Sequence, residues 1–181
     1  MNTHYYELWQ EMSIFDQWYL SDPLDGNGND IYGWHFTRGE KYSGPTPKEV
    51  KIVNSGKKFP ISFGGLNIPY IRRDVFSIII NECNFDSENF PIIIDDETYE
   101  LVNFLNVIKA VHPNSEIEKN DNGDIKYIWR LILDKKKIPQ NCDFFRIEEW
   151  PEKLYASQKV KDILNNSNYD FGLRFDEITV M

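Results

Sequence analysis

The feature that most constrains the fold is a turn signal between two runs of strand-forming residues. Residues 120–124 read Asn-Asp-Asn-Gly-Asp and contain the Asn-Gly pair that a type I′ turn favours. Ile117 lies before this turn, and residues 125–133, rich in β-branched and aromatic side chains, follow it. The pattern predicts a long β-hairpin, which is typical of folds built from antiparallel strands.

Most of the remaining sequence also predicts strands. Runs of strand-forming residues lie at positions 5–9, 15–20, 32–36, 50–53, 90–94, 144–147, 154–156 and 172–179. Apolar residues at helical spacing predict a helix that starts at Pro69, with Asn67 as its cap, and a second helix capped by Ser157. We therefore expect an α+β fold, with residues 1–181 in a single domain that has a mainly antiparallel sheet and about two to three helices.

The segment at residues 101–108 fits two structures. Leu101, Phe104, Leu105 and Ile108 have the spacing of one helical face. The apolar run across residues 99–104 also fits a strand that is buried on both faces. Periodicity leaves both alternatives open.

Charge narrows the range of partners. The 181 residues include 20 Lys and Arg against 29 Asp and Glu, which gives a formal net charge of −9. A surface of this sign repels phosphate backbones and anionic lipids. We expect neither nucleic acid nor a membrane to be a direct partner.

Several features predict a cytoplasmic protein. The longest apolar runs, such as residues 78–80 and 92–94, are far shorter than the roughly 20 residues of a membrane-spanning helix. The first residues lack the basic and apolar regions of a secretory signal. Cys83 and Cys142 lie in unlike contexts and fit reduced thiols better than a disulfide or a zinc site.

Local motifs for catalysis or metal binding are absent from the sequence. Residues 25–30 begin like a calcium loop, but Asp30 stands where glycine is required and Phe36 stands where a bidentate glutamate is required. We interpret residues 21–30 as a surface loop. The three histidines form no pair with metal-ligand spacing. We expect no cofactor, no metal and no catalytic residue.

Acidic residues lie next to aromatic residues in two places. Charged side chains steer a partner, and buried aromatic rings anchor it. Trp34 follows an acidic loop, and Trp150 follows two glutamates. The candidate binding residues are Asp22, Asp25, Asp30, Trp34, Glu148, Glu149 and Trp150. The alternative for each ring is that it belongs to the core.

The order of motifs along nearly the whole chain resembles a known family. The segments that carry the resemblance are Tyr5-Tyr6-x-Leu8, Trp18-Tyr19-Leu20, the acidic Gly loop, Phe145-Arg146-Ile147, Leu154-Tyr155-Ala156-Ser157 and Phe171-Gly172-Leu173-Arg174-Phe175. In this order they resemble the immunity proteins of bacterial polymorphic toxin systems, of the MXAN type first catalogued as a domain of unknown function. In that resemblance, residues 99–106 correspond to a central strand of the family.

The resemblance implies an inhibitor that is not an enzyme. Such a protein binds a cognate toxin domain in the cytoplasm of the producing or neighbouring bacterial cell and blocks its active site. Many toxins of these systems act on nucleic acids and are basic, which suits an acidic partner. Two alternatives from other classes are a small-molecule enzyme with a dispersed site, such as His35, Asp95 and His112, and an adaptor module.

Overall fold

The computed structural model describes residues 4–11 and 16–181, and this part of the chain contains four β-sheets, two α-helices and three 3₁₀-helices. The strands are β1 (Tyr5–Gln10), β2 (Tyr19–Leu24), β3 (Glu49–Asn54), β4 (Ile61–Phe63), β5 (Pro69–Arg72), β6 (Ser87–Ile94), β7 (Glu97–Phe104), β8 (Val107–Ile108), β9 (Glu116–Lys119), β10 (Ile125–Arg130), β11 (Ile132–Leu133), β12 (Phe144–Ile147), β13 (Trp150–Ser157) and β14 (Leu173–Val180). The helices are α1 (Arg73–Glu82), α2 (Gln158–Asn165), η1 (Gly33–Phe36), η2 (Gly65–Asn67) and η3 (Lys135–Lys137).

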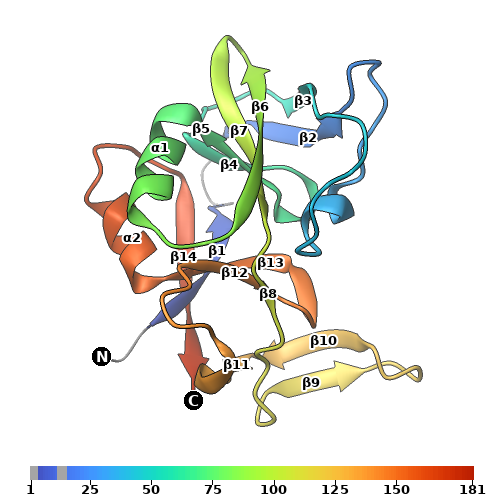
Figure 1. Cartoon of the computed structure of the whole chain (residues 1–181), viewed down its shortest axis with the longest axis vertical. Coiled ribbons are helices and arrows are strands. Elements are labelled where there is room, and N and C mark those ends of the chain that lie inside the picture. Colours follow the sequence, from blue (N-terminus) through green and yellow to red (C-terminus); the bar gives the residue numbers. More distant parts are fainter. Residues whose placement is uncertain (1–3, 12–15) are drawn as a thin grey trace.

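The largest sheet crosses the middle of the molecule (Figure 1). Its strand order is β11-β14-β1-β13-β12-β8. The central strand β1 pairs antiparallel with β13 and β14, whereas β11 pairs parallel with β14, and β8 pairs parallel with β12. The α+β prediction is confirmed, but this sheet is mixed and not purely antiparallel.

The remaining sheets are antiparallel. One has the order β4-β5-β7-β6, and the ribbons β2–β3 and β9–β10 make up the others in the described residues. The β6–β7 hairpin turns at Asp95 and Asp96, which both have positive φ. Aspartate tolerates that conformation better than most residues, which suits it to this turn.

Three apolar clusters fill the molecule. The first lies between the two larger sheets and the helices α1 and α2, and includes Leu8, Val75, Phe104, Leu154 and Val160. The second lies under η1 and β2 and includes Trp18, Phe36, Tyr70, Tyr99 and Leu101. The third covers part of the opposite face of the six-stranded sheet and includes Tyr5, Leu133, Phe145, Ile147 and Tyr155.

The hairpin predicted at residues 120–124 is confirmed as β9–β10, although its second strand ends at Arg130. The ambiguous segment at residues 101–108 is strand, in β7 and β8. Leu101 contributes to the second cluster, and its neighbour Val102 contributes to the first. Both faces of β7 are therefore buried, which explains why the sequence shows no alternation of polarity there.

Other predicted elements are wrong or shifted. Residues 33–36 form η1 and not a strand. The helix predicted from Pro69 begins only at Arg73, because residues 69–72 pair with β4 and β7 as strand β5. Of the predicted surface loop at residues 21–30, residues 21–24 belong to β2. The strand predicted from residue 15 is observed from Tyr19, and residue 15 itself lies outside the described residues.

Ser157 precedes α2, as predicted, but its side chain does not cap the helix. The Ser157 hydroxyl instead donates to Asp143 Oδ1 at 2.6 Å. Asp143 Oδ2 accepts the backbone N–H of Asn84 at 2.8 Å. This carboxylate therefore joins the ends of both α-helices to β12.

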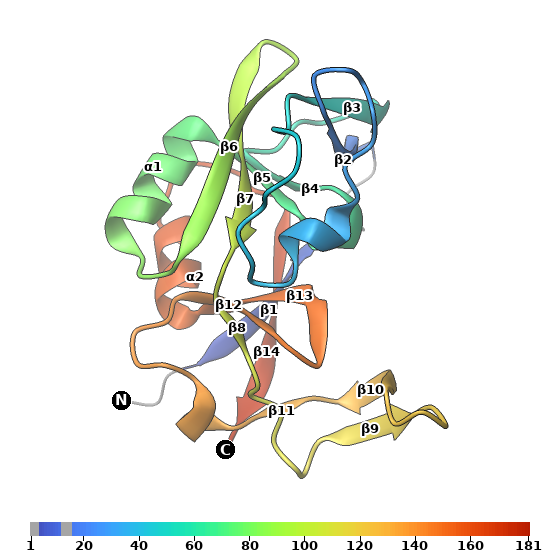
Figure 2. The ribbon, with the colours of Figure 1, turned by 45° about the vertical axis from the view of Figure 1, so that its right-hand side comes forward.

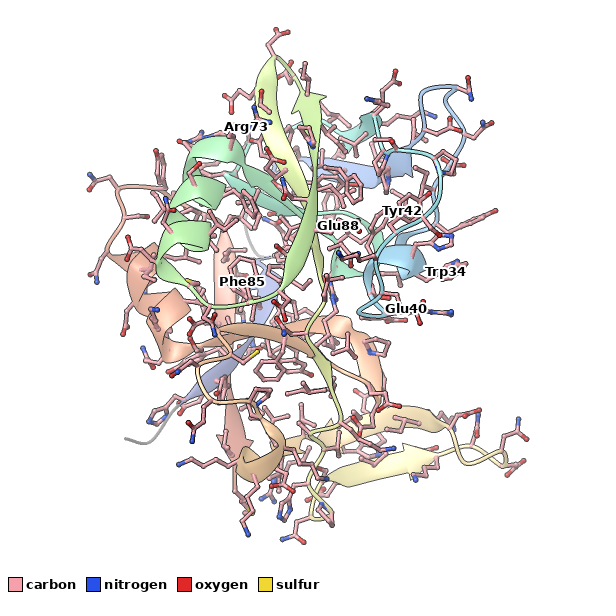
Figure 3. All side chains as sticks on the ribbon, viewed as in Figure 1. Trp34, Glu40, Tyr42, Arg73, Phe85 and Glu88 are labelled. Atoms are coloured by element: carbon pink, nitrogen blue, oxygen red, sulfur yellow. The ribbon has the colours of Figure 1, made fainter. Side chains whose placement is uncertain are left out.

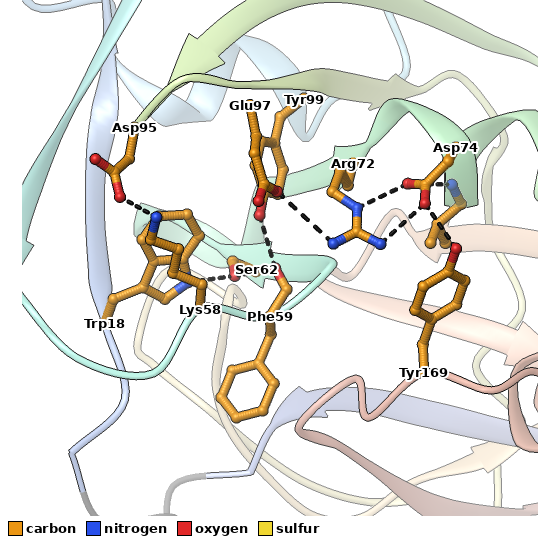
Figure 4. Close-up of polar contacts among 11 residues, drawn as sticks. Trp18, Lys58, Phe59, Ser62, Arg72, Asp74, Asp95, Glu97, Tyr99 and Tyr169 are labelled. Atoms are coloured by element: carbon orange, nitrogen blue, oxygen red, sulfur yellow. Dashed lines mark hydrogen bonds and ion pairs between the residues drawn. The ribbon is translucent and has the colours of Figure 1, made fainter.

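A polar network joins β5 and α1 to the segment before β14 (Figure 4). Arg72 Nε donates to Asp74 Oδ1 at 2.8 Å, and the Tyr169 hydroxyl donates to Asp74 Oδ2 at 2.7 Å. The hydrogen bond from Arg72 lowers the pKa of Asp74 from 3.8 to about 2. In the same region, Trp18 Nε1 donates to Ser62 Oγ at 2.7 Å.

Candidate functional site

A groove of about 500 Å³ lies between the β9–β10 hairpin and an uncovered part of the six-stranded sheet. Its walls come from β1, β10, β13 and β14. Aromatic rings dominate the lining, contributed by Trp9, Tyr127, Trp129, Trp150 and Tyr155. We call this feature the aromatic groove. Its volume falls within the range of about 300–1,000 Å³ that is typical of ligand sites.

The alternation of side chains along β1 and β13 determines which residues form the floor of the groove. Side chains two residues apart on a strand point to the same face, so Glu7 and Trp9 face the groove while Leu8 enters the first cluster. On the neighbouring strand, Tyr155 pairs with Glu7, and Lys153 lies two residues before Tyr155. The groove is thus the part of this sheet face that the third cluster leaves uncovered.

A partly buried ion pair lies on this floor. Lys153 Nζ is 2.9 Å from Glu7 Oε1, and the same ammonium lies 3.2 Å from the centre of the Trp9 ring. Burial raises the pKa of Glu7, and the nearby Lys153 opposes that rise. Burial, together with the carboxylates of Glu7 and Glu149, also raises the pKa of Tyr155. The groove therefore already holds one cation between an aromatic face and a carboxylate.

Apart from Glu7 Oε1, whose contact is the ion pair with Lys153, two buried polar atoms near the groove have no hydrogen-bond partner within the described residues. They are Trp9 Nε1, a donor, and Glu149 Oε2, an acceptor. Leaving such a group unpaired costs about 1–3 kcal/mol. A ligand that brings an acceptor for Trp9 and a donor for Glu149 would remove that cost.

The turn that carries Glu149 and Trp150 is held from behind by Arg146. This fully buried side chain donates to the Pro151 carbonyl at 2.9 Å and to the Asn67 carbonyl at 2.8 Å. Asn67 Nδ2 also donates to the Glu152 carbonyl at 3.1 Å. Trp150 itself is half-buried and packs against the third cluster, so part of this ring belongs to the core.

The β9–β10 hairpin projects from the body of the molecule (Figures 1 and 2). In the described part of the chain, its strands pair only with each other. Its base is fixed because the Ser115 hydroxyl donates to the Ile132 carbonyl and accepts the Ile132 N–H, each at 3.0 Å. Tyr127 and Trp129 lie 4.3 Å apart between ring centres and are 48% and 67% exposed. Large exposed rings on a fixed support are typical of protein-binding surfaces.

The acidic loop before η1 has a different chemistry. Asp25 is only 6% exposed, because its Oδ1 accepts the backbone N–H groups of Asn27 and Asn29. Hydrogen bonds from Asn29 lower the pKa of Asp25. Asp22 Oδ2 accepts the N–H of Gly33 at 3.2 Å, so this carboxylate ties β2 to η1. Both acids therefore act within their own loop, whereas Asp30 is exposed.

Trp34 lies on η1, on the same side of the molecule as Tyr42 (Figure 3). It is exposed, but its ring stacks with His35 at 3.7 Å between centres and lies under the Arg38 guanidinium at 4.3 Å. The Trp34 ring is thus already in contact with two neighbours in sequence.

The structure divides the seven candidate binding residues into two groups. Trp150 lines the aromatic groove, and Glu148 and Glu149 lie in the β12–β13 turn just before it, whereas the four others surround η1. The η1 segment, the β12–β13 turn and the hairpin lie on one side of the molecule in both ribbon views (Figures 1 and 2).

Sequence reasoning missed several residues of the groove. Tyr127 and Trp129 alternate on the second strand of the predicted hairpin, and this spacing was the available signal. Trp9 and Lys153 come together only through the pairing of β1 with β13.

The residues of the alternative enzyme site do not come together. Asp95 lies in the β6–β7 turn, at the end of the molecule opposite the segment that follows β8 and contains His112 (Figure 1). His35 contacts the rings of Trp34 and Tyr42. Over residues 4–11 and 16–181, no group of three or more His, Cys, Asp or Glu side chains is placed to hold a metal ion.

The sequence was compared with protein-family models and with curated proteins. No family model matches the sequence, and the curated proteins contain no match either. Among the described residues, no helix has the length and apolar character needed to cross a membrane.

Proposed function

We propose that this chain is a cytoplasmic immunity protein, which binds a cognate toxin domain of a bacterial polymorphic toxin system and neutralises it without catalysis. The observation that carries the proposal is the aromatic groove beside a projecting hairpin with exposed Tyr127 and Trp129. The resemblance of its motif order to that of the immunity proteins supports the same function.

A binding role accounts for the exposed rings. Tryptophan and tyrosine are enriched among residues that dominate binding energy, and they act best where neighbouring residues exclude water. Trp129 extends from the hairpin, and Trp9 and Trp150 line the wall opposite. A partner loop between these walls would bury rings from both sides at once.

The net charge supports a basic partner. At −9, the chain would attract a toxin domain whose active site binds phosphate groups, and this attraction raises the association rate. The hairpin and groove would then cover the active site of the toxin, and the acids on this side of the molecule would occupy the place of its anionic substrate.

The direct test is co-expression with the toxin domain encoded next to this chain. We expect cells to survive with both proteins and to die with the toxin alone, and we expect a single complex in size-exclusion chromatography. Separate elution together with undiminished toxicity would contradict the proposal. Turnover of a small-molecule or nucleic-acid substrate by the purified chain, lost on His35→Ala or Asp95→Asn, would favour the enzyme alternative.

A further inference from the structure

We propose that the aromatic groove receives an arginine side chain from a basic loop of the partner. The proposal rests on the proposed function and adds the chemistry of the contact. It follows from the cation already bound in the groove, the two unpaired polar atoms and the balance of charges around them.

The bound cation shows what the groove walls accept. The Lys153 ammonium lies 3.2 Å from the centre of the Trp9 ring and 2.9 Å from Glu7 Oε1. Aromatic faces attract cations, most strongly where water is excluded. The rings of Trp129 and Trp150 offer further faces in the same groove, and no cation lies over either of them in the described residues.

In the turn beside the groove, one carboxylate has no ion-pair partner within the described residues. Lys153 pairs with Glu7, and Arg130 Nη1 lies 3.5 Å from Glu116 on the hairpin. Glu177, also in the lining, is hydrogen-bonded to His4 Nδ1 at 2.6 Å, and this contact is an ion pair only when the imidazole is protonated. Glu149 forms no ion pair within the described chain, and its Oε2 is buried without a hydrogen bond. A second cation from outside the chain would balance it.

Arginine fits these groups better than lysine. Its planar guanidinium stacks on aromatic rings, loses hydration more easily than an ammonium and offers several N–H donors to a carboxylate. The backbone of the same loop supplies carbonyl oxygens, one of which would accept the N–H of Trp9 Nε1. A basic peptide segment would therefore supply a hydrogen-bond donor to Glu149 Oε2 and an acceptor to Trp9 Nε1.

The test uses three fluorescein-labelled peptides, Gly-Gly-Xaa-Gly-Gly, in which Xaa is arginine, lysine or citrulline. Citrulline keeps the shape of arginine and lacks its charge. In fluorescence anisotropy, we expect the arginine peptide to bind at least about tenfold more tightly than the citrulline peptide, because a desolvated cation–π contact and a charge-assisted hydrogen bond are lost. Equal binding of the two peptides, or no binding of the arginine peptide up to about 1 mM, would overturn the proposal.

Variants locate the binding in the groove. We expect Glu149→Gln and Trp129→Ala each to weaken arginine-peptide binding by about tenfold. The matched control is Ile93→Ala, which removes a residue that is 71% exposed on the β6–β7 hairpin at the other end of the molecule. Its affinity should equal that of the parent chain. Circular dichroism melting confirms that each variant is folded, and equal loss in all three variants would overturn the proposal.

The complex separates this proposal from the proposed function. Neutralisation of the toxin with unchanged affinity in Glu149→Gln and Trp129→Ala would overturn the groove contact and leave the immunity function standing. Specific peptide binding without toxin neutralisation would support the groove contact and overturn the immunity function. Sedimentation of the chain alone provides a third arm, because a dimer that Trp129→Ala dissociates would show that a second copy occupies the groove.

Discussion

The aromatic groove and the acidic loop before η1 both combine carboxylates with a tryptophan, yet their polar groups are used differently. In the loop, both oxygens of Asp25 accept hydrogen bonds from Asn27 and Asn29. Asp22 accepts the N–H of Gly33 through Oδ2, and its Oδ1 is buried without a partner in the described residues. In the groove, Trp9 Nε1 has no partner among the residues described, and neither has Glu149 Oε2 in the turn beside it. A carboxylate that is satisfied locally stabilises a turn, whereas an unsatisfied one is available to a ligand.

Trp34 and Trp129 differ in the same way, because the ring of one already has neighbours and the other is largely exposed. Trp34 already stacks with His35 and lies under Arg38, its neighbours on the chain. Trp129 contacts Tyr127 and remains 67% exposed. Proximity of acids and rings in sequence is therefore a weak indicator of a binding site, because it does not distinguish rings with neighbours from rings without them. Six variants test this comparison.

The largest effect is expected from Arg146→Ala. The substitution leaves the carbonyls of Pro151 and Asn67 unpaired in a buried place, which should lower the free energy of unfolding by about 2–4 kcal/mol. It should also weaken partner binding, because the turn that carries Trp150 loses its support. Urea denaturation measures the first effect, with Arg174→Ala as the control at an exposed arginine. Equal stability of the two variants would show that the turn does not depend on Arg146.

Trp129→Ala should reduce affinity for the toxin by about 30-fold, or about 2 kcal/mol, and leave the melting temperature nearly unchanged. Trp34→Ala should reduce affinity by less than about tenfold, since its ring is engaged within its own segment. Isothermal titration with the purified toxin compares the two. A larger loss at Trp34 than at Trp129 would move the binding site from the groove to η1.

Two conservative carboxyl substitutions should change stability in opposite directions. Asp25→Asn should lower the melting temperature at neutral pH, because the ionised carboxylate accepts hydrogen bonds from Asn27 and Asn29. Glu149→Gln should leave stability unchanged or raise it by up to about 1 kcal/mol, since it removes a charge whose buried oxygen has no partner.

Acid titration adds a second measurement for Asp25. Its pKa is lowered in the folded chain, so its stabilising contribution is present above the unfolded pKa and is lost as pH falls through the folded value. Melting from neutral pH to about pH 2 should therefore be less pH-dependent in Asp25→Asn than in the parent chain. Identical curves would mean that the loop does not use this charge.

The smallest effect is expected from Asp30→Asn. This exposed acid contributes only to the long-range field, which is screened over about 8 Å at physiological ionic strength. Its loss should slow association slightly and flatten the salt dependence, with no change in the dissociation rate. Surface plasmon resonance across a salt series measures this. An altered dissociation rate would place Asp30 within the contact.

Local signals predicted the elements that are fixed by local chemistry. The Asn-Gly pair correctly placed the β9–β10 turn, and Ser157 correctly marked the start of α2. Residues 69–72 could not be assigned, because the apolar spacing continues into α1 while pairing with β4 and β7 makes them a strand. The burial of β7 on both faces likewise removed the alternation that identifies a strand.

The candidate site was predicted in part. Glu148, Glu149 and Trp150 were chosen from their adjacency, and the structure places Trp150 in the groove lining and the two glutamates in the turn before it. Trp9 and Lys153 were not, because 144 positions separate them in sequence and only strand pairing joins them. The burial of Asp25 also could not be predicted, since it depends on how residues 25–29 fold back on one carboxylate.

The attachment of the hairpin has a consequence for how recognition can change over time. The β9–β10 ribbon shares no strand ladder with the rest of the described chain and is tied at its base through Ser115 and Ile132. Surface substitutions away from packed or hydrogen-bonded features usually change the free energy of unfolding by less than about 0.5 kcal/mol, so changes at the outer end of the ribbon should have little effect on the stability of the body. Substitutions can therefore accumulate on the ribbon with little effect on folding. During evolution, recognition of a partner that itself changes could be maintained by substitutions in the β9–β10 hairpin alone.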